Sequence, residues 1–252
     1  FPPAWLFTWV TLMGLCVGSF LNAVIGRLPR EMSIVTPPSH CPKCKHQLRW
    51  YENIPVLSYL FLRGRCSGCK VTISIRYPMV EVLMMLLSAA LWIRLGPTTE
   101  FLIWWPLSAV LLTITFLDID HFWIPDIIVF PSLVLVLLAS LLPGALSPVE
   151  ALMGALPGLL LWAVAYGYAA LTGREGMGFG DIKLLLLIGA AIGPMGGLHV
   201  LYVSALQGLV IGSLVLATGG HRGADEGERV EFDDGWEPPA KAVPFGPFLA
   251  LG

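Results

Sequence analysis

Residues 184–221 read LLLLIGAAIGPMGGLHVLYVSALQGLVIGSLVLATGGH, without a single Asp, Glu, Lys or Arg. A helix needs about 20 apolar residues to cross the hydrocarbon core of a bilayer, so this run is long enough for two membrane-spanning helices. Gly193-Pro194-Met195-Gly196-Gly197 in its middle supplies the break between them. The stretch therefore predicts a helical membrane protein.

The same composition continues through the rest of the chain, which is 56% hydrophobic and 13% charged. Soluble domains carry about 25% charged residues. We therefore expect an all-α polytopic membrane fold of about eight transmembrane helices. Short turns are expected at Gly96-Pro97 and Pro143-Gly144. The remaining apolar runs are 4–26, 78–93 (which contains Glu81), 101–117, 127–149, 151–173 and 242–252.

Basic residues predict how the helices are oriented. Nine of the 15 Lys and Arg residues lie between Arg27 and Arg76, and Lys and Arg are enriched in cytoplasmic loops. This loop should therefore be cytoplasmic. Alternating the spans then places the segments 118–126, 173–181 and 219–243 at the same face.

These features divide the chain into three parts. Residues 1–26 form a first transmembrane helix, which we expect to be retained because it lacks the basic start of a signal peptide. Residues 27–77 form a cytoplasmic module, and residues 78–252 form a second membrane region with an acidic cytoplasmic loop at 219–243. The acidic stretch 225–237 within that loop is expected to be solvated and flexible. We find no internal repeat and no nucleic-acid-binding signature.

Four of the five cysteines form two pairs, Cys41-Pro-Lys-Cys44 and Cys66-Ser-Gly-Cys69. Paired CxxC units at this spacing are typical of a zinc ribbon, in which four thiolates fill a tetrahedron and leave no position for water. The sequence thus predicts a structural Zn²⁺ site. Two disulfides are the alternative, but cytoplasmic thiols stay reduced. His40 and His46 are expected to be neighbours of the site rather than ligands.

Two acidic motifs stand at predicted ends of membrane helices: DIDHFWIPD at 118–126 and GFGDIK at 178–183. Ionisable groups inside a membrane are costly, so they indicate function by default. As structural alternatives, Asp181 could cap its helix, and Asp118 and Asp120 could face headgroups. Asp126, directly after Pro125, is expected to have a structural role in a first helical turn.

Two carboxyl groups from separate helices could share one proton and hydrolyse a peptide bond, one as base and one as acid. Gly178 and Gly180 remove side chains beside Asp181, and Lys183 lies close to it in the sequence. The partner of Asp181 could be Asp118 or Asp120, which lie about 200° apart around a helix. Periodicity does not choose between them.

Taken together, the motifs resemble those of the type IV prepilin leader peptidase/N-methyltransferase family of GxGD-type membrane aspartyl proteases. The resemblance covers nearly the whole chain. It is carried by both acidic motifs, by the cysteine pairs, and by GSFLNAVIGRLP at 18–29, NIPVLSYL at 53–60, LRGRC at 62–66, IRYPMVE at 75–81 and PFGPF at 244–248.

This resemblance implies an enzyme of the bacterial inner membrane that cuts the short basic leader from prepilins or pseudopilins of type IV pili or type II secretion. It assigns catalysis to Asp118 and Asp181, with Asp120 as the alternate. The cysteine module implies that the enzyme also methylates the new N-terminal residue with S-adenosylmethionine. Gly64 matches a position linked to methylation, and Asn53 and Glu81 are candidate cofactor residues. Glu81 could instead be a buried anchor that pairs with Arg76 or a backbone group.

Two other classes of protein remain as alternatives. A proton-coupled transporter could use the membrane Asp residues as a relay, but it would favour acids near the midplane and inverted repeats. A zinc-stapled assembly platform would need no catalysis.

Overall fold

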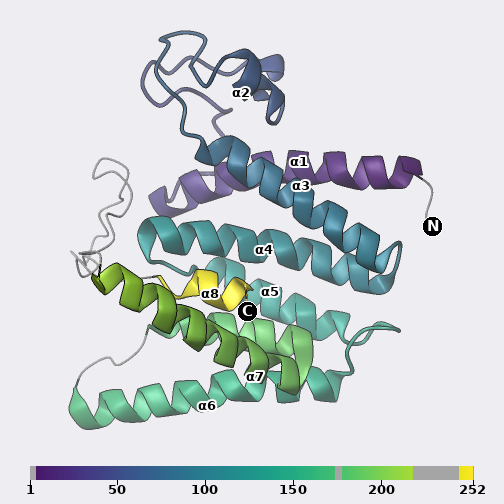
Figure 1. The fold of residues 1–252 in the computed structure, drawn as a ribbon, viewed down its shortest axis with the longest axis vertical. Coiled ribbons are helices and arrows are strands. Elements are labelled where there is room, and N and C mark those ends of the chain that lie inside the picture. Colours follow the sequence, from purple (N-terminus) through teal and green to yellow (C-terminus); the bar gives the residue numbers. More distant parts are fainter. Residues whose placement is uncertain (1–3, 174–177, 218–243, 252) are drawn as a thin grey trace. The chain divides into compact units, whose positions relative to one another are not determined.

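The computed structural model describes residues 4–173, 178–217 and 244–251, so the acidic stretch 225–237 lies outside the described residues. The described residues form helices and no β-strand. In chain order they are α1 (Ala4–Arg27), η1 (Leu28–Arg30), η2 (Trp50–Asn53), α2 (Leu57–Phe61), α3 (Arg76–Leu95), α4 (Thr99–His121), α5 (Asp126–Ala139), α6 (Pro148–Thr172), α7 (Phe179–Ala217) and α8 (Gly246–Leu251) (Figure 1).

Five of these helices are long and apolar enough to cross a membrane: α1 with η1, α3, α4, α6 and α7. The all-α membrane fold is confirmed, whereas the count of eight spans is not. One expected span differs in length: the helix expected over 127–149 stops at Ala139 and has 14 residues. In the last apolar run, 242–252, the described residues include helix α8.

The predicted break inside residues 184–221 is confirmed. Gly193 has φ 80° and ψ 177°, which lies outside the helical region, and Pro194 follows it. The two halves of α7 turn back on one another, because a Cβ on Gly197 would lie 3.3 Å from the Cα of Gly189. Helix α7 is thus a pair of adjacent helical segments.

Residues 1–113 and 114–252 form two compact units. In the first unit, α1 and α3 pack side by side through glycines (Figure 1). A Cβ on Gly14 would lie 2.4 Å from Ser88 Oγ, and a Cβ on Gly18 would lie 2.6 Å from the Cα of Glu81. Small residues let membrane helices approach this closely. The four-cysteine segment is attached at one end of this helix pair.

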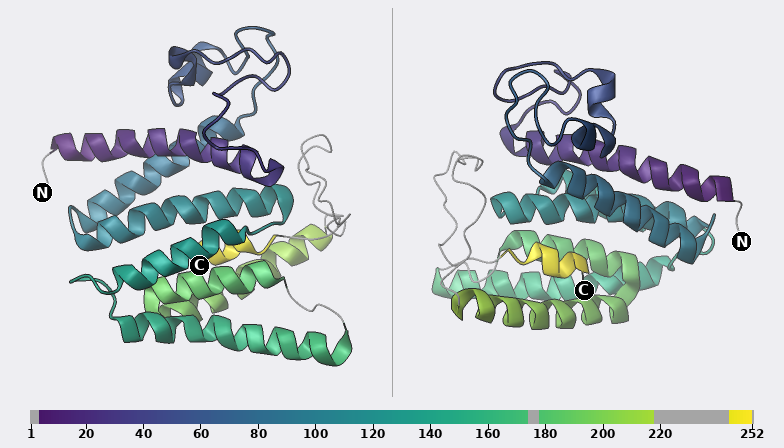
Figure 2. Two further views of the ribbon diagram at one scale, coloured as in Figure 1. Left: turned by 180° about the vertical axis from the view of Figure 1, so that it is seen from behind. Right: turned by 45° about the horizontal axis from the view of Figure 1, so that its top comes forward.

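In the second unit, α6 and α7 lie side by side (Figure 2). Their contact also depends on glycine, since a Cβ on Gly154 would lie 2.0 Å from the carbonyl oxygen of Gly189. Helices α5 and α8 pack on α7 as well. Helix α7 is therefore in contact with three other helices of its own unit.

Replacing Gly154 with Ala should destabilise the second unit, because the new methyl group has to displace the backbone of α7. Overpacking of this kind costs about 1–3 kcal/mol. The unfolding temperature in detergent should fall by several degrees. Gly167→Ala in the same helix is the control, because its Cβ would meet nothing within 4 Å. Equal stability of the two variants would contradict this packing.

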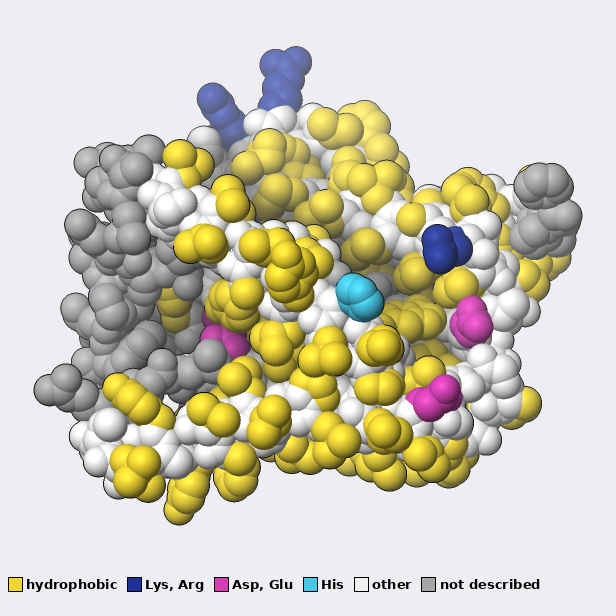
Figure 3. All heavy atoms as spheres, turned by 60° about the horizontal axis from the view of Figure 1, so that its bottom comes forward, with side chains coloured by type: hydrophobic (Ala, Val, Ile, Leu, Met, Phe, Trp, Pro, Cys, Tyr) yellow, Lys and Arg dark blue, Asp and Glu magenta, His cyan; other side chains and the backbone are white. Residues whose placement is uncertain are grey.

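The outer surface fits a lipid environment. One face of the molecule is covered mainly by hydrophobic side chains, with few charged groups among them (Figure 3). Helix α6 contributes many exposed apolar side chains, and proteins dissolved in water rarely expose so large an apolar surface. They include Leu152, Leu156, Leu159, Leu160, Val164 and Tyr166.

Candidate active site and metal site

Asp118 lies in the last turn of α4. The helix ends there because Phe122 adopts a left-handed conformation with φ 53°, and Pro125 directs the chain into α5. The Asp118 side chain is buried, and its residue is 5% exposed. Its Oδ2 accepts a hydrogen bond of 2.8 Å from the backbone N–H of Gly246. A carboxyl group held inside a membrane protein in this way is a candidate for function.

Asp181 lies in the first turn of α7 and is half-buried. Its carboxyl group lies within the range of a Coulombic interaction with that of Asp118. The structure therefore brings together two acids from separate helices. Asp120 is half-buried rather than buried. Of the two alternatives in the first motif, Asp118 is the one that lies deepest in the protein.

The two glycines before Asp181 have different surroundings. A Cβ on Gly180 would lie 3.0 Å from the Cβ of Ile124, so glycine lets α7 pack against the segment that follows α4. A Cβ on Gly178 would meet only Asp181 Oδ2, at 3.6 Å. Gly180 thus serves packing, and Gly178 leaves space beside the carboxyl group.

Lys183 forms an ion pair with Asp126, and its ammonium also lies 6.0 Å from the centre of the Phe130 ring. Asp126 is the first residue of α5, as expected from its place after Pro125. The pair joins the N-terminal ends of α5 and α7. This position supports a structural role for Asp126 and makes Lys183 a support of the turn that carries Asp181.

The four paired cysteines form one cluster in which every sulfur lies within 4.8 Å of the other three. The Sγ atoms of Cys41 and Cys69 are 3.8 Å apart, and those of Cys44 and Cys66 are 3.9 Å apart. Metal–sulfur bonds of about 2.3 Å in a tetrahedron give sulfur separations of about 3.8 Å. All four are free thiols, so the disulfide alternative does not describe this structure. The cluster could hold one metal ion.

The two cysteine pairs share the same backbone geometry. The N–H of Lys45 donates to Cys41 O, and the N–H of Lys70 donates to Cys66 O, with φ 59° and 60° at the two lysines. In the first pair the N–H of Cys44 lowers the pKa of the Cys41 thiol to about 7. Burial and the contacts with the other three thiols raise the pKa of Cys44 to about 11, so the four thiols hold their protons unequally.

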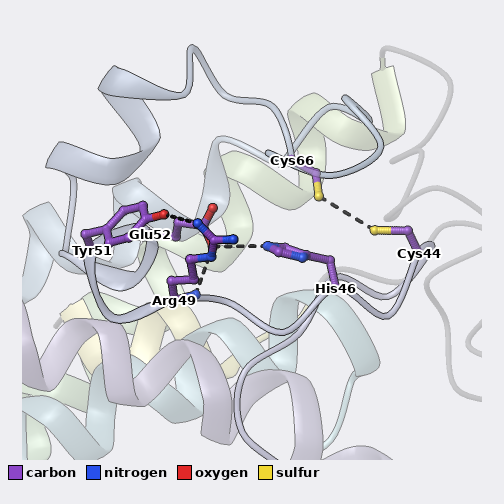
Figure 4. A network of polar contacts seen from close by, with 6 residues as sticks. All are labelled: Cys44, His46, Arg49, Tyr51, Glu52 and Cys66. Carbon is purple, nitrogen blue, oxygen red and sulfur yellow. Dashed lines mark hydrogen bonds and ion pairs between the residues drawn. The ribbon is translucent and has the colours of Figure 1, made fainter.

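Glu52 holds the surroundings of this cluster together. Its Oε2 accepts 2.8 Å and 3.2 Å hydrogen bonds from Arg49 N and His46 Nε2, as drawn in Figure 4. The N–H of Arg49 is the main reason that the pKa of Glu52 falls to about 2, so this buried carboxyl is ionised. His46 in turn packs against Gly68 of the second pair. His46 is therefore a neighbour of the cluster, as expected, and its ring is bound to Glu52.

Replacing Glu52 with Ala should loosen the cluster, because His46 and the Arg49 N–H lose their shared acceptor. Changing groups outside the ligand shell typically costs about 10- to 100-fold in metal affinity. Release of Zn²⁺ to a chromophoric chelator should accelerate by at least about tenfold. Glu100→Ala, on the exposed start of α4, is the control. Unchanged release would mean that Glu52 has no part in metal retention.

The predicted cofactor residues Asn53, Gly64 and Glu81 lie in the first unit. Glu81 Oε2 accepts the N–H of Val56 at 2.7 Å, so the segment after Asn53 is attached to α3. This is the contact of a buried anchor that pairs with a backbone group. Gly64 has φ 65°, and a Cβ there would lie 2.9 Å from the Tyr59 hydroxyl. Asn53 is exposed. A cofactor role for the three residues stays a prediction.

Sequence reasoning missed two groups in these sites. Glu52 carried no metal-ligand signal, because it contacts the neighbours of the cysteines. The N–H of Gly246 is a backbone group 128 residues from Asp118. The only available signal was the PFGPF motif, which has no chemistry of its own.

Comparison with known proteins identifies the family. The family model described as the bacterial peptidase A24 N-terminal domain matches residues 12–95, and that of the type IV leader peptidase family matches residues 105–213. A protein named prepilin leader peptidase/N-methyltransferase from Pseudomonas putida is 40% identical over 272 residues, covering 99% of this chain and 89% of the relative. Its namesake from Aeromonas hydrophila is 39% identical, with 98% and 89% covered. No solved structure matches this chain.

The first matched region contains the cysteine cluster, and the second contains Asp118 and Asp181. Both matches and the relatives agree with the resemblance found in the sequence motifs, and the several apolar helices agree with a multi-pass protein of the bacterial inner membrane. The chain belongs to the type IV leader peptidase family.

Proposed function

We propose that this protein is a bifunctional enzyme that removes the short basic leader of type IV prepilins or pseudopilins and then methylates the new N-terminal residue. The observation that carries the proposal is the pair Asp118 and Asp181, two neighbouring carboxyl groups on separate helices of a chain that is similar to prepilin leader peptidases/N-methyltransferases over nearly its full length. The transporter and the assembly platform are not favoured by these relatives.

The proposed hydrolysis uses the two carboxyl groups in complementary roles. One carboxylate takes a proton from water, and the other carboxyl group donates a proton to the scissile carbonyl oxygen. The hydroxyl oxygen bonds to the carbonyl carbon, and the tetrahedral intermediate then loses the amine after its nitrogen is protonated. The products are the leader with a free carboxylate and the mature pilin with a free N-terminal amine.

The surroundings of Asp181 suit an extended substrate. Gly178 places no side chain beside the carboxyl group, and its missing Cβ would lie 3.6 Å from Asp181 Oδ2. A peptide backbone could approach there closely. We assign this space to the segment around the cleaved bond, at the cytoplasmic face where the leader and the basic residues 27–76 should lie.

The cysteine cluster is assigned to a structural Zn²⁺, because four thiolates with these separations fill a tetrahedron. S-adenosylmethionine is the proposed methyl donor, since it supplies an electrophilic methyl group to the new amine when bound. Asn53, Gly64 and Glu81 are the proposed residues of its site. Cysteines, donor residues and catalytic acids are all assigned to the cytoplasmic side.

Incubating the purified protein with a candidate prepilin and S-adenosylmethionine tests the proposal. Intact-mass spectrometry should show loss of the leader and then a gain of one methyl group on the mature N-terminus. Omitting S-adenosylmethionine should stop the second change only. A set of prepilins and pseudopilins that all keep their leaders would contradict the proposal.

Gly64→Ala should reduce methylation and spare leader cleavage. The new side chain has two costs: the positive φ of 65° is strained for alanine, and its Cβ would lie 2.9 Å from the Tyr59 hydroxyl. Positive φ alone costs about 1–3 kcal/mol. Gly96→Ala, with φ 63° and no neighbour within 4 Å, isolates that backbone cost. Equal methylation by the two variants would show that the Tyr59 contact is irrelevant.

A further inference from the structure

The PFGPF motif at 244–248 has no role in the proposed chemistry so far. In the second unit its last three residues, Gly246, Pro247 and Phe248, begin α8 and are buried. The Gly246 N–H donates to Asp118 Oδ2 at 2.8 Å. Donor and acceptor are both buried, so water does not compete for this bond.

The position of this N–H is fixed by packing against α7. Ser204 Oγ donates to the carbonyl oxygen of Phe248 at 3.0 Å. The Phe245 ring lies against Gly208, where a Cβ would be 3.0 Å from the ring. The donor is therefore held on both sides by contacts of its neighbours Phe245 and Phe248 with α7.

Any side chain at position 246 would require the Asp118 carboxyl group to move. A Cβ there would lie 2.8 Å from Asp118 Oδ2 and 3.2 Å from its Cγ. Gly246 has no side chain where the Asp118 carboxyl group needs the space, and its backbone N–H donates to one of the two Asp118 carboxyl oxygens. Packing of a short helix alone would not require both features at the same residue.

We propose that Gly246 is a positioning residue for the peptidase reaction, whose N–H holds Oδ2 of Asp118 and thereby fixes the plane of that carboxyl group. This rests on the proposed function of the two acids. Hydrogen bonding to Oδ2 assigns proton exchange with water or substrate to Oδ1. Orienting a reacting group in advance lowers the barrier to reaction and leaves substrate binding unchanged.

Two variants test the proposal. Gly246→Ala keeps the N–H but pushes on the carboxyl group, and an amide-to-ester replacement at Gly246, made with glycolic acid, removes the N–H and adds no side chain. The ester should lower kcat for leader cleavage about 10- to 100-fold, the effect of losing one hydrogen bond to a charged group. Gly246→Ala should lower kcat to a similar degree of about 10- to 100-fold because it displaces the carboxyl group from its orientation. KM for the prepilin should stay within about twofold. Gly212→Ala, which faces open space on α7, should behave like the wild type.

Methylation of a pilin that has already lost its leader serves as the folding control, because that reaction does not use Asp118. A positioning role predicts full methylation in both Gly246 variants, whereas misfolding lowers methylation and cleavage together. Wild-type kcat in either variant, a rise in KM alone, or parallel loss of both activities overturns the proposal. Failure of the wild-type protein to cut any prepilin would instead refute the proposed function itself.

Discussion

Asp118→Asn and Asp181→Asn should each abolish detectable leader cleavage, lowering kcat by about 10²- to 10⁴-fold. Asparagine keeps the size of the side chain but can neither accept the proton from water nor donate one to the carbonyl. Each change removes one half of a pair whose members lie within interaction range. Release of the leader, followed by mass spectrometry of the pilin, measures the effect.

Asp120→Asn is the matched control for this prediction, because it is two residues from Asp118 in the same helix and half-buried. It should keep at least about a third of wild-type kcat, a loss below about 1 kcal/mol. Methylation of a mature pilin should persist in all three variants and show that they are folded. If Asp120→Asn lost cleavage and Asp118→Asn kept it, Asp120 would be the catalytic residue in place of Asp118.

Combined replacement of Cys41 and Cys66 by Ser should remove the metal ion and abolish methylation. It takes one ligand from each pair, and structural zinc sites contribute about 10–16 kcal/mol of binding free energy to their small domains. Metal content measured by elemental analysis should fall from about one Zn²⁺ per chain to none.

Cys16→Ser is the control for this experiment, since Cys16 lies in α1 away from the cluster and is exposed. It should keep its metal and its methylation. If the double variant bound Zn²⁺ as tightly as the wild type, the tetrahedral assignment would be wrong. Full methylation by a metal-free double variant would show that methylation does not require the metal-bound cluster.

Much of the fold could be predicted because a bilayer restricts the solutions available to a chain. Apolar runs must form helices there, since no water satisfies an exposed backbone. The break at Gly193 was also predictable, because Gly and Pro residues interrupt helices. The length of α5 was not, because an apolar run does not show where its helix stops. The helix expected over 127–149 ends at Ala139 without any charged residue to mark it.

The candidate site was predictable in its parts but not in its arrangement. Chemistry pointed to Asp181 and to one member of the pair Asp118 and Asp120. Which of the two is buried depends on how α4 packs, and a helix with apolar residues all round carries no periodic signal for that. The contact of Asp118 with Gly246 depends on segments at opposite ends of the second unit, which no local pattern relates.

In the cysteine module, too, the residues of the site could be predicted and part of their arrangement could not. Its ligand set could be predicted from two CxxC pairs, because the ligand spacing itself defines such a site. The role of Glu52 could not, since it depends on the position of the Arg49 N–H and the His46 ring in the folded segment.

Helix α5 has 14 residues, and so does the first half of α7 before its break, residues 179–192. At 1.5 Å per residue each measures about 21 Å, well short of the ~30 Å hydrocarbon core. Such hydrophobic mismatch makes the surrounding bilayer thin, or lets polar groups reach inward. One of these short helices follows Asp118 and the other carries Asp181, so the lipid barrier should be lowest where a hydrolytic reaction needs its water.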